Sequence, residues 1–134
     1  MCYNVGMKVR AVTAGCNLGS PLDMAAFARV ADLCKRAKEE IERRGIEVQT
    51  LRVAGGRLNG VLAKAGAVVA LAQQLDSACR KEGIDVASVG CVDATIRGIP
   101  DAFASEIAAA VARTENVFAS VLAESIERAS GRLP

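Results

Sequence analysis

The chain alternates between short segments rich in β-branched residues and longer segments with helical periodicity, and this alternation restricts its fold more than any other feature. Runs of Val, Ile and Thr predict strands at residues 8–14, 46–53 and 86–92. Apolar residues spaced three and four apart predict helices at residues 22–44, 60–82 and 100–113. Because a helix separates each strand from the next, the sequence predicts an α/β fold of repeated β-α-β units. The sheet is expected to be mostly parallel, with right-handed crossovers that place the helices on one face.

The expected helix boundaries come from capping residues. Ser20 is the predicted N-cap of the first helix, with Pro21 at the first helical position, and Gly45 ends that helix. Residues 60–82 are expected to form one long helix, more buried than the first, with Leu75 on its apolar stripe.

The last regular segment, residues 117–124, fits either a strand or a helix. Its β-branched content and its place after a helix favour a fourth strand. At 134 residues, the chain is expected to form one domain. Residues 1–7 fit no element and are expected to be an extension.

Composition excludes several classes of function. The chain has no His, which excludes His bases and His-ligated metals, and we expect neither a metal nor a cofactor. A net charge of +2 and 3% aromatic residues argue against nucleic-acid binding. No uncharged run approaches the roughly 20 residues that span a bilayer, and no secretory signal is evident, so we expect a cytoplasmic protein that does not bind membranes.

Five cysteines are present, and no two of them form a CxxC pair. Cys34 and Cys79 fall on the apolar stripes of helices and are expected to be buried. Cys16 and Cys91 lie near strand ends, and one of them precedes a helix N-terminus, which can lower the pKa of a thiol. They are therefore interpreted either as reactive thiols or, more commonly for cysteines, as buried structural residues.

Polar side chains interrupt the predicted strands. Arg10 and Arg52 lie inside them, and Ser88 and Ser120 sit at comparable depth. A sheet covered by helices on both faces shows continuous apolar runs instead. The second face is therefore expected to line a barrel interior or an open cleft; the alternative is that these side chains reach water at the sheet edges.

Loops at the carboxyl ends of parallel strands are the usual ligand sites. Three such loops carry polar residues, namely Asn17 and Ser20, then Arg57 and Asn59, then Asp93, Thr95 and Arg97. With Arg10 and Arg52, these residues are the candidates for binding a small anionic metabolite. Each also has a structural interpretation: a capped loop, a solvated turn, or a salt bridge between Asp93 and Arg97.

Four segments resemble a known family. Residues 9–15 read VRAVTAG, residues 21–23 read PLD, residues 45–53 read GIEVQTLRV and residues 114–121 read TENVFASV. In this order they resemble the family called domain of unknown function 711, whose members are labelled pyruvate-formate-lyase-like, over residues 7–131. The resemblance implies an α/β barrel related to that of glycyl-radical enzymes. It does not imply radical chemistry, since the adjacent Cys pair of pyruvate formate-lyase is absent.

Two functions follow as hypotheses. The first is a small-molecule-binding or enzymatic module that holds an anionic metabolite at the strand ends. The second is a non-catalytic assembly or regulatory subunit, one part of a split barrel, because the resemblance implies relatives that continue beyond the fourth strand. In either case we expect a homo-oligomer, or a partner chain that completes the barrel, with residues 117–122 at the contact.

Overall fold

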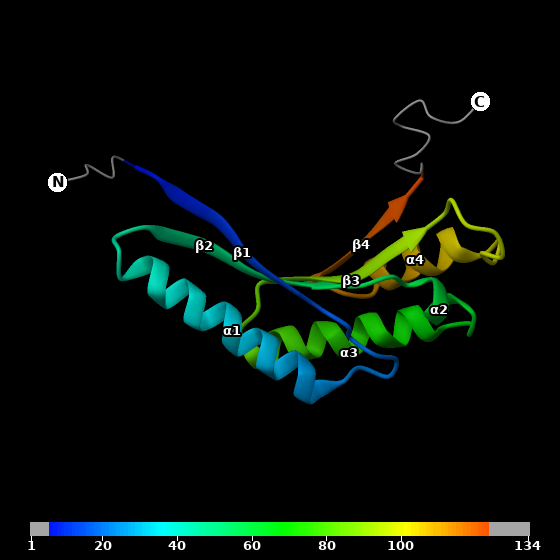
Figure 1. Ribbon diagram of the computed structural model, residues 1–134. Helices are drawn as coiled ribbons and strands as arrows, with labels where there is room; N and C mark the ends of the chain where they lie inside the picture. The colour runs from blue at the N-terminus through cyan, green and yellow to red at the C-terminus, as the bar shows by residue number, and fades with distance from the viewer. Residues whose placement is uncertain (1–5, 124–134) are drawn as a thin grey trace, which may run out of the picture.

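The computed structural model describes residues 6–123, in which strands and helices alternate as the sequence predicts (Figure 1). In chain order the elements are β1 (Lys8–Cys16), α1 (Met24–Glu42), β2 (Glu47–Gly55), α2 (Asn59–Leu62), α3 (Ala67–Glu82), β3 (Val86–Asp93), α4 (Phe103–Ala112) and β4 (Val117–Leu122). The fourth strand is confirmed. Residues 1–5 of the expected N-terminal extension lie outside the described part, whereas Gly6 and Met7 precede β1 without joining an element.

The four strands form one sheet in the order β1-β2-β3-β4, and every neighbouring pair is parallel. The predicted α/β class is therefore confirmed. The helices lie on one face of the sheet, and the other face is not covered by any described element (Figure 1). We call this second surface the helix-free face. The sheet of the described residues is open, with β1 and β4 at its edges.

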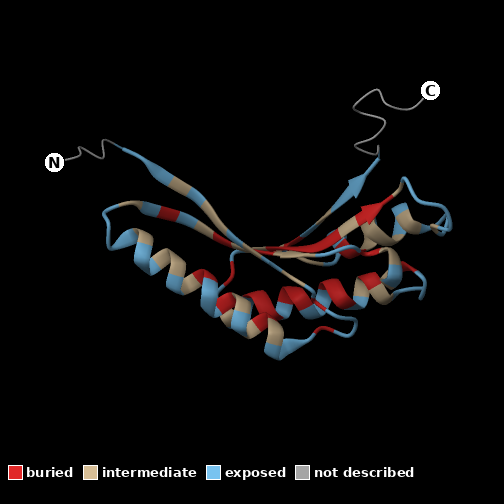
Figure 2. Ribbon diagram, in the orientation of Figure 1, coloured by how far each residue is buried: buried red, intermediate tan, exposed pale blue. Residues whose placement is uncertain are grey.

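The core lies between the sheet and the helices (Figure 2). Phe27 of α1, Leu75 of α3 and Val92 of β3 are fully buried there. Cys34 and Cys79 are also fully buried, as predicted, and burial raises the pKa of the Cys79 thiol to about 11. Seven residues of α3 are buried, whereas only three of α1 are, so α3 is the more buried helix, also as predicted.

The start of α1 differs from the prediction. Asp23, not Ser20, is the N-cap, and its carboxylate accepts a hydrogen bond from the Ala26 N–H (2.9 Å). The Asp23 N–H is held by the Leu18 carbonyl (2.7 Å), which keeps the intervening residues in a turn before the helix. Ser20 therefore does not present a helix N-terminus, and Pro21 is not the first helical residue.

The segment predicted as one helix at residues 60–82 is divided into α2 and α3. Gly66 has φ +74°, a left-handed conformation that cannot continue a right-handed helix. The Gly66 N–H donates to the Glu106 carboxylate of α4 (2.9 Å), which stabilises the break from outside the segment. Likewise α4 begins at Phe103 rather than Pro100, after a turn in which the Phe103 N–H donates to the Pro100 carbonyl (3.0 Å).

Candidate functional site

The carboxyl ends of β1, β2 and β3 meet at one edge of the sheet. Cys16, the last residue of β1, pairs with Gly55, the last residue of β2. Beyond β2 the chain continues beside β3, where Arg57 forms an isolated bridge with Cys91. The loops that carry Asn17 and Arg57 are therefore brought to the same edge as Asp93, the last residue of β3, as the parallel topology requires.

The loop after β2 packs against the backbone of β3. The Cys91 N–H donates to the Gly56 carbonyl (3.0 Å), and the Leu58 N–H donates to the Cys91 carbonyl (2.8 Å). A Cβ on Gly55 would lie 2.6 Å from the Val89 carbonyl oxygen, so this glycine is required for close packing within the chain. Only glycine fits where two backbones approach this closely.

Asp93 is held in a network of hydrogen bonds at the end of β3. Its backbone exchanges two hydrogen bonds with the Asn59 side-chain amide (2.9 and 3.0 Å). Its carboxylate accepts from the Thr95 hydroxyl (2.6 Å) and from the Thr95 N–H (3.1 Å). These bonds from Thr95, with the nearby Arg57 guanidinium, hold the pKa of Asp93 below its usual value against the opposing effect of burial. The residue is therefore ionised at neutral pH.

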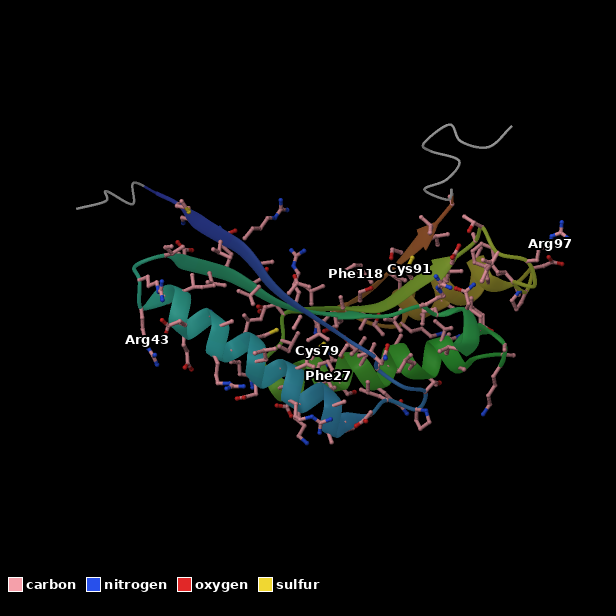
Figure 3. All side chains as sticks on the ribbon, in the orientation of Figure 1. Phe27, Arg43, Cys79, Cys91, Arg97 and Phe118 are labelled. Carbon is pink, nitrogen blue, oxygen red and sulfur yellow. The ribbon has the colours of Figure 1, made fainter. Side chains whose placement is uncertain are left out.

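The expected salt bridge between Asp93 and Arg97 is not formed. Asp93 pairs with Arg57 instead, at 3.6 Å between Nη2 and Oδ2. Arg97 projects from the loop between β3 and α4, away from the strand ends (Figure 3). The reason is the β2–β3 register, which sets Arg57 beside Cys91, close to the end of β3.

The lowered pKa of Asp93 predicts how stability depends on pH. The folded protein binds the proton at Asp93 less tightly than the unfolded chain does, so the ionised carboxylate stabilises the fold at neutral pH. This contribution is fully present above the unfolded pKa of about 4 and is lost as the pH falls through the lower folded pKa. Urea denaturation of the wild type and of Thr95→Val across this range tests it. Thr95→Val should weaken stability at neutral pH, and the difference should shrink in acid; a constant difference would contradict the prediction.

Two neighbouring hollows lie at the strand ends. One, of about 210 Å³, is lined by the loops after β1 and β2 and includes Asn17, Ser20, Gly56 and Arg57. The other, of about 390 Å³, lies over Gly15, Ala54, Gly55 and Gly56, with Asn17 at its rim. Asn17 and Gly56 are common to both. We refer to the first as the strand-end cavity.

The structure thus brings together some of the candidate residues and separates others. Asn17, Ser20 and Arg57 line the strand-end cavity. Asp93 at the end of β3 pairs with Arg57, and Asn59 and Thr95 hold Asp93 in place by hydrogen bonds. Arg52 lies in β2, two residues before Ala54. Arg10 is exposed in β1, and Arg97 belongs to neither group.

The cysteines at the strand ends are half-buried. Burial, and to a lesser degree the nearby Asp23 carboxylate, raises the pKa of the Cys16 thiol. This is opposite to the shift that an activated thiol requires. Because Asp23 caps α1, the helix N-terminus does not act on Cys16 as the hypothesis of a reactive thiol supposes.

Sequence reasoning missed one buried polar residue, Asp76 of α3. Its carboxylate pairs with Arg80 and accepts hydrogen bonds from the N–H groups of Glu115 (3.3 Å) and Asn116 (2.9 Å). The signal was an acidic residue next to Leu75 in a mostly apolar stripe, with Arg80 four residues later. Asp76 fixes the turn that leads into β4, so its role is structural.

Other features of the described surface do not add to this site. A hollow of about 520 Å³ lies on the outer side of α3, near Met24, and Lys81 is its single charged lining residue. Within residues 6–123, no three Cys, Asp or Glu side chains lie close enough together to hold a metal ion. None of the described helices has both the length and the apolar character needed to cross a bilayer.

The fold and these loops define an all-parallel α/β protein with helices on one face of its sheet and a polar cluster at the strand carboxyl ends. The chain belongs to the family described as Uncharacterised ACR (DUF711), whose model matches residues 1–130. The resemblance seen in the sequence is therefore confirmed at the level of the family. A comparison with curated proteins finds no match to this chain.

Proposed function

We propose that this protein is a small-molecule-binding or enzymatic module that holds an anionic metabolite at the carboxyl ends of its strands. The observation that supports this most directly is that the Arg57 side chain is exposed and only loosely paired. Its side chain is 66% exposed beside the strand-end cavity, and its ion pair with Asp93 spans 3.6 Å. A guanidinium placed in this way keeps planar donors available for a carboxylate or a phosphate.

The neighbouring groups suit binding better than acid–base catalysis. Asn17 supplies an amide at the same cavity, and Ser20 supplies a hydroxyl. Asp93 has a lowered pKa, which makes it a weak base and leaves it without a proton to donate at neutral pH. Its role in the proposal is to position Arg57. We include in the proposal a pyruvate-formate-lyase-like relationship without glycyl-radical machinery. We also propose a cytoplasmic location, because the four described cysteines are free thiols.

The test is a titration with inorganic phosphate, simple carboxylates and phosphorylated metabolites, followed by NMR of the backbone amides. We expect shifts at Asn17, Gly56 and Arg57, and Arg57→Gln should weaken binding by about tenfold or more, because a charge-assisted hydrogen bond is lost. Arg97→Gln is the matched control, since it removes the same charge from a loop that points away from the cavity. Absence of binding to the wild type, or equal losses in both variants, would refute the proposal.

A second candidate function is assembly, and the composition of the β4 edge favours it. Phe118, Val121 and Leu122 are 42%, 45% and 40% exposed, and β4 contains no charged residue, proline or glycine. The opposite edge strand, β1, carries Lys8 and Arg10. Proteins commonly protect edge strands with such charges, so β4 is the unprotected edge. We propose that a second copy of the chain, or a partner chain that completes a barrel, covers β4.

Light scattering during gel filtration tests the assembly. The wild type should elute as a dimer or larger species, and Phe118→Lys should convert it towards a 13.9 kDa monomer. Leu33→Lys, which places the same charge on the exposed side of α1, should leave the assembly intact. A wild-type monomer at all concentrations would refute self-association.

A further inference from the structure

The hollow over Gly15 lies on the helix-free face. The register aligns Gly15, Ala54, Ser88 and Phe118 across all four strands, and Phe118 lies on the side of the sheet opposite Phe27 and Cys79 (Figure 3). The hollow is about 390 Å³ and is floored by Gly15, Ala54, Gly55 and Gly56. A small molecule bound here would contact the sheet directly.

The packing of the chain itself does not require glycine at position 15. Its φ is not positive, and a Cβ there would meet only the Ala54 carbonyl oxygen, at an ordinary 3.8 Å. Gly55, in contrast, is required by the close approach of Val89. The hollow therefore exists because position 15, which has room for a side chain, is occupied by glycine. Close approach of a ligand to the backbone is one of the reasons for which strands contain glycine.

Arg52 does not line the hollow but precedes it in β2, two residues before Ala54. Side chains alternate along a strand, so Arg52 shares the face of Ala54, two residues away. Arg52 is half-buried, and its Nε is buried without a hydrogen-bond partner among the described residues. Buried donors are normally satisfied, so this guanidinium is suited to an anionic partner. Arg57 lies beyond the opposite end of the hollow, roughly 16 Å further along the chain path.

We infer that the ligand is an elongated dianion, with one anionic group on Arg57, the other on Arg52, and an apolar middle over Gly15 and Ala54. The inference rests on the proposed function, which needs only the anion at Arg57, and adds the second anchor and the chemical class. An α,ω-dicarboxylate has this chemistry. Glycine and alanine backbones supply the flat surface on which its methylene chain lies.

The test is a calorimetric titration with dicarboxylates from succinate to azelate, each compared with the monocarboxylate of equal length. We expect affinity to peak at one chain length, where the dicarboxylate binds at least about tenfold more tightly than the monocarboxylate. Arg52→Gln should abolish this advantage and leave monocarboxylate binding unchanged. Arg43→Gln, which removes an exposed arginine just after α1 on the helix side of the sheet, is the control and should change neither.

A second variant examines the hollow itself. Gly15→Val should fold normally, since the position is open and valine favours strands, and a melting curve verifies this. It should remove the dicarboxylate advantage, because its side chain fills the hollow. If wild-type dicarboxylates bind no more tightly than monocarboxylates, or if Arg52→Gln keeps the advantage, the inference fails while the proposed function stands. If the wild type binds neither class of carboxylate, the inference fails, and the proposed function fails with it when inorganic phosphate and phosphorylated metabolites do not bind either.

Discussion

Replacing Gly90 by Ala is expected to cost at least about 3 kcal/mol of folding free energy, a large share of the roughly 5–15 kcal/mol available to such a domain. Gly90 has φ +137°, a conformation in which a side chain is strained. Its Cβ would also overlap the Gly56 carbonyl oxygen and lie 3.0 Å from Leu58 Cγ. The backbone of the loop after β2 cannot move away without losing its hydrogen bonds to Cys91. Urea denaturation measures the loss.

Gly45→Ala is the matched control for this prediction. Gly45 also has positive φ, at +78°, but a Cβ there has no neighbour within 4 Å. Its cost should therefore be limited to backbone strain, about 1–2 kcal/mol. If Gly90→Ala and Gly45→Ala lose the same stability, the close approach of Gly56 does not restrict position 90 to glycine. The arrangement of the loop that carries Arg57 would then need revision.

Leu75→Ala is expected to destabilise the fold by about 2–5 kcal/mol. Leu75 is fully buried in α3, at the centre of the core between sheet and helices. Removing its side chain loses transfer free energy and leaves a cavity that the surrounding buried core residues, held in close packing, cannot fill. Thermal and urea unfolding should both show the loss.

Leu33→Ala provides the comparison, because Leu33 is 52% exposed on α1 and its truncation should change stability by less than about 0.5 kcal/mol. A shift within error for Leu75→Ala would mean that the apolar stripe of α3 does not face the core. The prediction made from periodicity alone would then be wrong.

Local patterns of apolar residues were sufficient to predict most helices and strands, because each element buries one of its faces and exposes the other. The stripe containing Phe27 and Cys34 predicted α1, and burial of both residues confirms it. The β-branched residues of Val117–Leu122 predicted β4, although the same segment also fitted a helix. The end of α3 was predicted at Gly83, which is its left-handed C-cap. The end of α1 comes earlier than predicted, at Glu42 with Arg43 as C-cap, and Gly45 takes its left-handed conformation in the turn that follows.

Predictions failed where a distant residue decides a local conformation. The break at Gly66 is held by Glu106, which is forty residues away in the sequence. Ser20 and Asp23 are both acceptable N-caps, and the choice of Asp23 follows from the turn closed by the Leu18 carbonyl. Likewise Asp93 had two possible arginine partners, and only the register of β2 against β3 selects Arg57 over Arg97.

By itself, then, the sequence determined the parallel α/β class, because a helix between successive strands supplies the long crossover that parallel pairing needs. It also determined that polar residues collect at the strand carboxyl ends, since the loops carrying them must meet at one edge. Tertiary structure alone decided which of them meet. The bulge between Ser88 and Gly90 and the pairing of Arg57 with Cys91 depend on backbone contacts between segments far apart in the chain. No local pattern encodes such contacts, because their free energy arises only when the strands are already side by side.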